Sequence, residues 1–420
     1  MQNLTPHTIT LSIYNDTATE FGVTWQTEAE GNPILEYTTT DDCNFANATV
    51  VIGTCTLGMG AFKNQAVFKN IHTGKKYLWR VGDNNGTYSD VFETQFPLHS
   101  EDKLNFLIVT DTQDEEHHGT WMKYPTIDAL KLNPNAEFII HTGDMVQEGG
   151  NSEMWKMMLE NTYNFFLSMP VAAISGNHDY WRGYLHDYRN ILDHHYAINY
   201  PNQDTTNGIY YSFDCGPAHF TMLSSGDSME TDNLGVLESQ LEWAINDIKT
   251  SDKKWKFVCV HNPFYSPGKY GCRSDLCTVA LALREQFNKV FAESGVDMVF
   301  CGHDHVYAQT FPISADGEPI HNYTYEIIES SGEKIKYIID PIGPIHLESG
   351  CCGHQSRGFE NWIGEEYTRF FDQMSPMSYG GVAYTSVSID GDMLEVCFRE
   401  INVNDGSCIR QYIFGIKKTK

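Results

Sequence analysis

Gly302-His303-Asp304-His305 and Gly176-Asn177-His178-Asp179 are the stretches that decide how the larger part of this chain folds. Each follows an apolar run, Val296 to Cys301 in the first case and Pro170 to Ser175 in the second. Ionisable residues that crowd together at a strand end lose solvation free energy unless a cation or a substrate uses them. Both stretches therefore indicate a chemically active site at the ends of buried strands.

Three further polar groups come directly after apolar runs: Asp111-Thr112-Gln113, Gly143-Asp144, and His261. From Leu104 onward, apolar runs alternate with helical stretches, which is typical of βαβ units and a largely buried sheet. The carboxyl ends of strands in such a sheet converge in space, and ligands bind there. We therefore expect the polar groups to lie together, although each one alone is an ordinary turn sequence.

The residue types in these groups indicate phosphoester chemistry. Carboxylate and amide oxygens and imidazole nitrogens are ligands that iron, manganese and zinc accept. Hydrolysis of a phosphate ester at neutral pH needs an activated water and positive charge on the developing oxyanion, and two bridged cations supply both. The sequence predicts a centre of two divalent or mixed-valence ions (Fe, Mn or Zn), at which metal-bound hydroxide attacks a small phosphorylated substrate.

Each predicted metal ligand has an expected place in this centre. Asp144 is expected to bridge the two cations, because cations that share a substrate oxygen need an anion between them. The two residues expected to complete the first cation site are Asp111 and His305. The three residues expected to complete the second cation site are Asn177, His261 and His303.

Two neighbouring residues are predicted to act in catalysis. His178 is expected to bind phosphate or to protonate the leaving oxygen, and Asp179 is expected to orient the His178 imidazole. The glycines at 143, 176 and 302 precede predicted ligands. They are expected to let the backbone turn sharply off each strand.

The first hundred residues differ from the rest, because short β-rich runs recur and no catalytic cluster is present. The runs are His7 to Tyr14, Phe21 to Thr27, Leu35 to Thr39, Thr49 to Thr54, Gln65 to Ile71, Lys76 to Val81 and Val91 to Phe96. Seven short strands predict an all-β sandwich over residues 1–98. A polar linker then leads to a catalytic domain over residues 103–420, for which a second covering sheet predicts a four-layer α/β/β/α sandwich.

Charge and hydropathy limit the partners and the location. The chain has 28 Lys plus Arg against 55 Asp plus Glu, a net charge of −27, which repels nucleic acid and anionic membrane surfaces. No stretch reaches the roughly 18 apolar residues of a membrane span, and the start lacks a signal-peptide pattern. We therefore expect no nucleic acid or membrane partner and a cytoplasmic location, or a secreted one if a leader has been removed. The oligomeric state is not predicted.

The run from Asp111 to His305 resembles the calcineurin-like metallophosphoesterases. The stretches Phe21 to Thr27 and Tyr77 to Asp83 resemble the fibronectin type III-like β-sandwich that precedes the catalytic domain in purple acid phosphatases. The resemblance covers almost the whole chain. It implies a four-layer α/β sandwich around a dinuclear metal site and acid phosphatase activity on phosphomonoesters.

The chain departs from that family pattern at three positions. Purple acid phosphatases carry a tyrosine ligand where this chain has Gln147, and related enzymes carry a histidine where it has Gln113. The first cation then lacks a fourth protein ligand unless the oxygen of Gln113 or Gln147 replaces it, and the tyrosinate colour should be absent. Asn262 stands where a second histidine is usual. Two alternatives stay open: a phosphodiesterase or nucleotide pyrophosphatase, or a degenerate phosphoesterase that acts as a binding protein.

Overall fold

The protein is described by a computed structural model of the 420-residue chain. The residues that it describes are 3–14, 17, 19–58, 60–98, 100–180, 210–225, 235–272, 277–330, 332–353 and 365–419. None of the helices in this part of the chain is both long enough and apolar enough to cross a lipid bilayer.

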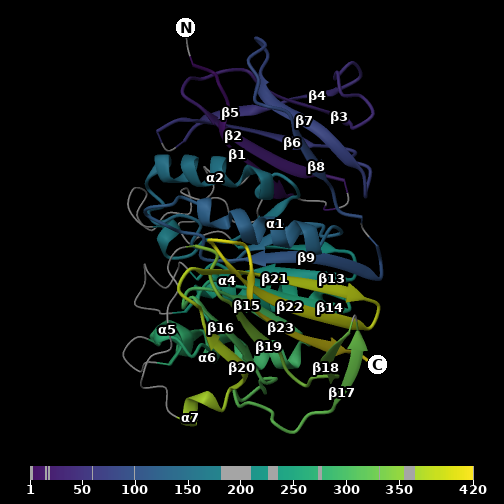
Figure 1. Ribbon diagram of the computed structural model, residues 1–420, viewed down its shortest axis with the longest axis vertical. Coiled ribbons are helices and arrows are strands. Elements are labelled where there is room, and N and C mark those ends of the chain that lie inside the picture. The colour runs from purple at the N-terminus through teal and green to yellow at the C-terminus, as the bar shows by residue number, and fades with distance from the viewer. Residues whose placement is uncertain are drawn as a thin grey trace.

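Eight strands fold the N-terminal region into two facing sheets, drawn in purple and blue in Figure 1. One sheet has the order β1 (His7–Ile13), β2 (Phe21–Thr27), β6 (Phe62–Phe68) and β5 (Thr54–Leu57). The other has the order β4 (Thr49–Ile52), β3 (Pro33–Thr39), β7 (Lys76–Asp83) and β8 (Phe92–Gln95). The predicted sandwich is present, but the single run predicted over Thr49 to Thr54 gives one strand to each sheet. The chain changes sheets at Gly53, where a Cβ atom would lie 2.5 Å from the Gln65 carbonyl oxygen.

Aromatic rings fill the space between the two N-terminal sheets. The Phe68 ring lies edge-on to Trp79 with 5.6 Å between centroids, and Phe96 packs against Phe21 at 4.4 Å. Large apolar residues alternate along β2, which is typical of a strand with one buried face, but every residue of this strand is buried. The second face of β2 is buried because Thr24 hydrogen-bonds to Thr10 of β1 (Oγ1 to Oγ1, 2.6 Å), and helix α2 (Ser152–Phe166) covers β1.

The second region, from Lys103 onward, begins with parallel strands separated by helices, as predicted. The elements are β9 (Lys103–Val109), α1 (Lys123–Leu132), β10 (Phe138–His141), α2 (Ser152–Phe166) and β11 (Val171–Ala173). The helix predicted from Thr120 starts with a short 3-10 turn before α1. The side chain of Asn151 caps α2 by accepting hydrogen bonds from the N–H groups of Glu153 and Met154.

The C-terminal strands extend this first sheet on the other side of β9. They are the hairpin β17 (Tyr325–Ser330) and β18 (Glu333–Ile339), and the strands β21 (Gly381–Asp390), β22 (Met393–Asn402) and β23 (Cys408–Lys417). At its opposite end the sheet continues into the N-terminal region, because β1 pairs in parallel with β11 at Ser12 and Val171. The β8 strand is also fixed there, since the Leu167 carbonyl oxygen accepts a hydrogen bond from Thr94 Oγ1. The two regions therefore share one twelve-stranded sheet.

A seven-stranded sheet covers the first one. Its order is β12 (Tyr211–Cys215), β13 (Ala218–Met222), β14 (Trp255–Cys259), β15 (Met298–Cys301), β19 (Ile345–Ser349), β16 (Val306–Thr310) and β20 (Phe371–Pro376). The associated helices are α4 (Glu238–Thr250), α5 (Lys269–Cys272), α6 (Thr278–Glu293) and α7 (Glu365–Thr368). The Phe106 ring of the first sheet packs against Phe220 and Phe257 of the second, with centroids 5.3 and 5.7 Å apart. This arrangement is the predicted four-layer α/β/β/α sandwich (Figure 1).

Candidate metal centre

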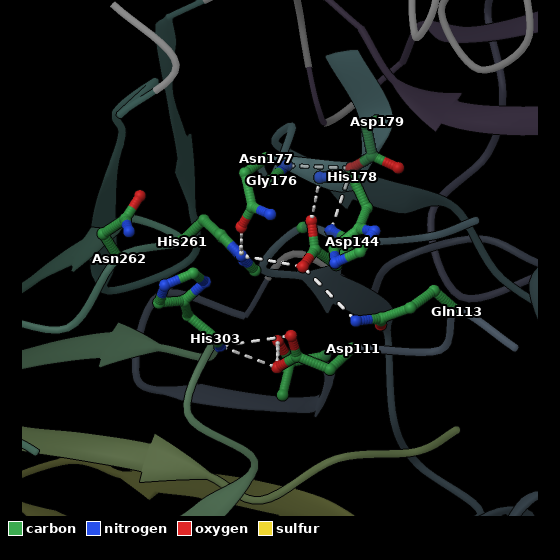
Figure 2. A network of polar contacts seen from close by, with 12 residues as sticks. Asp111, Gln113, Asp144, Gly176, Asn177, His178, Asp179, His261, Asn262 and His303 are labelled. Carbon is green, nitrogen blue, oxygen red and sulfur yellow. Dashed lines mark hydrogen bonds and ion pairs between the residues drawn. The ribbon is translucent and has the colours of Figure 1, made fainter. Parts of the chain in front are cut away.

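The predicted site residues come from the carboxyl ends of strands in both sheets, and the structure brings them together (Figure 2). The first sheet supplies the residues that follow β9, β10 and β11: Asp111, Gln113, Asp144, Asn177, His178 and Asp179. The second sheet supplies the residues that follow β14 and β15: His261, His303 and His305. The centre therefore forms where the edges of the two sheets meet.

The most compact part of the site contains Asp144, His261 and His303. One side-chain ligand atom from each residue lies within 4.8 Å of the other two. The His261 Nε2 atom is 3.1 Å from Asp144 Oδ2 and 3.2 Å from Asn177 Oδ1. The other ring nitrogen, Nδ1, lies 2.9 Å from the Thr142 carbonyl oxygen and donates to it. This hydrogen bond directs Nε2 of His261 to the centre, where it donates to the Asp144 carboxylate when the ring is protonated and would bind a metal ion when the ring is neutral.

Asp111, His305 and Gln113 form the other side of the site. The His305 Nε2 atom is 3.2 Å from Asp111 Oδ1 and 3.2 Å from Gln113 Nε2. The Gln113 Nε2 atom also lies 3.4 Å from Asp144 Oδ2, while Gln113 Oε1 is buried without a hydrogen-bond partner. Amide oxygen and nitrogen have nearly the same shape, so a turned amide would direct the Gln113 oxygen at the same neighbours. In that orientation the Gln113 oxygen would face the Asp144 carboxylate, and a cation between the two oxygens would fit this arrangement.

Four site residues have left-handed backbone conformations that non-glycine residues rarely adopt. The φ angles are 50° for Asp111, 56° for Asp144, 79° for His303 and 56° for His305. Each such residue costs about 1–3 kcal/mol and persists only where its surroundings fix it. Strain of this kind is concentrated at functional sites, which agrees with the position of these four residues.

The glycines that precede the ligands serve two different purposes. Gly143 has a φ of 102°, so the expected sharp turn is correct there. Gly176 and Gly302 do not have positive φ angles, and the expected reason is wrong for them. A Cβ atom on Gly176 would lie 2.2 Å from Asp144 Oδ1, and one on Gly302 would lie 2.4 Å from Asp111 Oδ2. These two positions need glycine because the carboxylates occupy the space of a side chain.

Asp179 holds the backbone around Asp144. Its carboxylate accepts N–H hydrogen bonds from Asp144, Met145 and Gly176, each at 2.8 Å. The sequence predicts that Asp179 orients the His178 imidazole, but the orienting group in the structure is the Gln147 carbonyl oxygen, 2.9 Å from His178 Nδ1. The difference arises because residues 178–180 form a 3-10 turn that places the Asp179 side chain under the loop after β10.

Charge inside the site favours a cation. Burial tends to raise the pKa of Asp111, but the imidazoles of His305 and His261 outweigh it, so the pKa lies below its ordinary value. Burial tends to lower the pKa of His261, but Asp144 and Asp111 raise it to about 9. The buried carboxylates thus attract positive charge, and a metal ion supplies that charge as well as a proton does.

His141 supports the site and is not identified by the sequence analysis. It is the last residue of β10, and burial lowers the pKa of its imidazole to about 3, so the ring is neutral. Its Nδ1 accepts a hydrogen bond from the Gly143 N–H (3.2 Å), and its Nε2 lies 3.0 Å from Thr112 Oγ1. The only sequence signal is a histidine that ends an apolar run two residues before Gly143.

Comparison with known proteins agrees with this geometry. Residues 104–307 match the Calcineurin-like phosphoesterase family, and residues 6–96 match the family described as Purple acid Phosphatase, N-terminal domain. The chain therefore carries a calcineurin-like phosphoesterase domain preceded by a purple acid phosphatase N-terminal domain.

Individual relatives are distant. Purple acid phosphatase 23 of Arabidopsis thaliana is 25% identical over 44% of this chain and 34% of its own length. Probable inactive purple acid phosphatase 9 of the same plant is 23% identical over 81% of this chain and 54% of its own length. The chain spans about a third to a half of the length of the first curated relatives it matches.

The fold is also that of a solved purple acid phosphatase structure. The protein PPD1 from yellow lupin (Lupinus luteus) seeds matches with a TM-score of 0.70 and 15% identity, over 99% of this chain and 75% of that chain. At this identity the match shows the shared fold alone. Both regions of the chain take part in it.

Proposed function

We propose that the protein is a metal-dependent phosphoester hydrolase with a dinuclear centre of iron, manganese or zinc, and that phosphomonoesters are its preferred substrates. The observation that carries the proposal is the meeting of Asp144, His261 and His303, whose ligand atoms lie within 4.8 Å of one another. Asp111 and His305 lie beside this group, with 3.2 Å between Oδ1 and Nε2. Buried carboxylates and imidazoles in this number are the donor set of such a centre.

Each side of the site would hold one cation, with Asp144 between them. The residues that would hold the first are Asp111, His305 and, through its amide oxygen, Gln113. The residues that would hold the second are Asn177, His261 and His303. When bound, the cations supply positive charge to the phosphoryl oxygens and acidify a water molecule.

His178 would act on the leaving group. Its backbone N–H donates to Asp144 Oδ1 at 2.7 Å, which fixes the residue beside the centre. Because Nδ1 is engaged by the Gln147 carbonyl oxygen, Nε2 is the atom that would give a proton to the leaving oxygen. Asp179 would have no direct part in this transfer, since its carboxylate holds the backbone of the Asp144 turn.

The test compares para-nitrophenyl phosphate with bis-para-nitrophenyl phosphate after addition of Mn²⁺, Zn²⁺ or Fe²⁺. We expect faster release of nitrophenol from the monoester and no purple colour with iron. A diester rate far above the monoester rate would reassign the protein as a phosphodiesterase or nucleotide pyrophosphatase.

We also propose that residues 1–98 and 103–420 are separate domains and that small phosphorylated molecules, rather than nucleic acids or membranes, are the partners.

A binding protein with a degenerate phosphoesterase domain is the second candidate. Gln147 and Asn262 replace a tyrosine ligand and a second histidine of purple acid phosphatases, and Gln113 replaces a histidine of related metallophosphoesterases. One matched relative is named as probably inactive. Metal analysis separates the two candidates. Fewer than about one tightly held ion per chain, with no hydrolysis after reconstitution, would favour the binding protein.

A further inference from the structure

The turn between β15 and β16 carries His303 and His305 on either side of Asp304. Both histidines have left-handed backbone conformations, with φ angles of 79° for His303 and 56° for His305. A turn with two such residues relaxes unless neighbouring groups hold it. The Asp111 carboxylate holds one point, because it accepts the His303 N–H at 2.9 and 3.1 Å. The Asp304 N–H, which lies between the two histidines, donates to the Gly302 carbonyl oxygen within the turn (3.1 Å) and also to a group outside the turn.

Glu348 of β19 supplies that contact. Its backbone pairs with Cys301 at the end of β15 and with Ala308 of β16, so it lies between the two strands that enter and leave the turn. The side chain is 1% exposed, and its Oε1 accepts the Asp304 N–H at 3.0 Å. The carboxyl group is otherwise enclosed by protein, with the Ser266 side chain as a further hydrogen-bonding neighbour. A carboxyl group in this state is a costly way to fill a core position, which indicates that its contact with the turn is needed.

The Asp304 side chain extends the same support to the His303 ring. Its carboxylate accepts the N–H groups of Tyr270 and Gly271, each at 3.1 Å. The Tyr270 ring in turn packs on the His303 ring with 4.5 Å between centroids. One face of the His303 imidazole is therefore set by a residue that Asp304 holds in place.

We propose that Glu348 and Asp304 are positioning residues, which hold the His303–His305 turn and the Tyr270 ring so that both imidazoles point at the cations. This inference rests on the proposed function, because it assumes a metal centre at these histidines. Neither residue reaches the cations or the substrate itself. Their removal should weaken metal binding and change its geometry without unfolding the protein.

The test uses the full chain and two matched substitutions at Glu348. Glu348→Gln keeps an oxygen that accepts the Asp304 N–H, whereas Glu348→Met has a similar volume and no such oxygen. Titration with Co²⁺ measures the affinity, and the visible absorption bands of bound Co²⁺ report the ligand geometry. We expect Glu348→Met to bind Co²⁺ about 10–100-fold more weakly with shifted bands, and Glu348→Gln to stay close to the wild type. Asp304→Ala and Asp304→Asn should differ in the same way.

His346→Leu is the control for a general defect of strand β19. His346 is buried two residues before Glu348, and both of its ring nitrogens lack hydrogen-bond partners. It packs on Phe264 and Tyr265, at 5.2 and 5.0 Å, instead of on the turn. We expect this variant to keep the affinity and the absorption bands of the wild type.

The outcomes separate the two proposals. A wild-type protein that binds no Co²⁺ overturns the proposed function, and this inference with it. A wild-type protein that binds Co²⁺ while Glu348→Met and Asp304→Ala bind it equally well overturns the positioning role alone. If Glu348→Met does not fold, the comparison of Asp304→Ala with Asp304→Asn decides, and equal weakening in both would also overturn the role.

Discussion

The N-terminal sandwich and the catalytic strand ends both bury polar groups, but they bury different kinds. In the sandwich most of the buried polar groups are neutral, with Lys63 and Asp83 as buried ionisable exceptions, and neutral groups are bonded to one another, as in Trp79 Nε1 to Thr94 Oγ1 at 2.8 Å and Asn64 Nδ2 to Thr27 Oγ1 at 3.0 Å. Such pairs stabilise the fold by satisfying hydrogen bonds that burial would otherwise leave unmade.

At the catalytic strand ends the buried groups are ionisable. Asp111 and Asp144 are at most 1% exposed and face imidazoles, on backbone conformations that cost free energy. Buried carboxylates contribute little to stability, because desolvation offsets most of their attraction to a partner. The N-terminal sandwich therefore uses buried polar groups mainly to stabilise the fold. At the strand ends of the phosphoesterase domain, buried carboxylates and imidazoles form a site although their burial costs free energy.

The largest expected effect separates activity from stability at the strand ends. Asp144→Ala should reduce phosphomonoester hydrolysis by more than about 100-fold, the upper end of what supporting residues around a metal cost. The midpoint of thermal unfolding in the absence of metal should change little. Steady-state assays with added Mn²⁺ and calorimetry measure the two quantities, with His303→Ala as a parallel variant. Activity that survives in either variant would refute the ligand assignment.

The second prediction compares two buried tryptophans, Trp79 in β7 of the sandwich and Trp155 in α2. Trp79→Ala should lower the free energy of unfolding by about 3–5 kcal/mol, because a buried ring is lost, and leave activity per folded molecule unchanged. Trp155→Ala should lower both, since Trp155 Nε1 donates to the Gly149 carbonyl oxygen (2.8 Å), and the Gly149 N–H in turn donates to the His178 carbonyl oxygen (2.9 Å). Denaturant titration and assays of the folded fraction check the pair. Equal loss of activity in both would show that the sandwich acts on the site.

The third prediction concerns metal addition. At a free Mn²⁺ concentration 100 times the dissociation constant, the wild type should gain about 2.7 kcal/mol of unfolding free energy over the metal-free protein. Trp79→Ala should gain the same unfolding free energy from Mn²⁺, although its metal-free form is less stable than the wild type. Asp144→Ala should gain almost none. Denaturation curves in Mn²⁺ and in chelator measure the gain. A gain that persists in Asp144→Ala would place the bound metal elsewhere.

The smallest expected effect concerns an ionisable cluster away from the strand ends. His219 lies between Asp214 (2.7 Å) and Asp247 (2.9 Å). Burial tends to lower the pKa of His219, but the two carboxylates outweigh it and raise the pKa to about 9. Because this value exceeds the unfolded one, near 6.5, the stabilisation is complete below pH 6.5 and is lost as the pH rises through about 9.

His219→Gln measures this contribution. The variant should be less stable than the wild type by about 1–2 kcal/mol at pH 6, a value reduced for the exposure of Asp214, and the gap should narrow above pH 9. Unfolding midpoints between pH 5 and 10 check the trend. A gap that does not change with pH would show that the imidazole stabilises the protein by packing alone.

Much of the fold can be predicted from local patterns. Alternating apolar residues in Phe21 to Thr27 predict a strand, and Gly143-Asp144 after an apolar run predicts a polar strand end. These signals are local, because side-chain periodicity and turn chemistry depend on a few adjacent residues. The five polar groups and the order of strands and helices around them follow from such signals.

Contacts between distant segments escape this kind of prediction. The pairing of Ser12 with Val171 joins the two regions in one sheet, and no pattern near either residue signals it. Glu348 stands in the segment Ile345-His346-Leu347-Glu348-Ser349, which gives no sign that this residue meets Asp304. The partner of His178 proves to be the Gln147 backbone, which a list of side chains does not contain.

The amino-acid sequence specifies which polar residues stand at the strand ends, since residue identity and local periodicity can be read from it directly. How these residues are held became visible only in the folded chain: the left-handed turns, the carboxylates that occupy the space beside Gly176 and Gly302, and the buried Glu348 behind the histidine turn. The physical reason is that these features depend on the packing of two sheets against each other, and packing joins residues that are far apart along the chain.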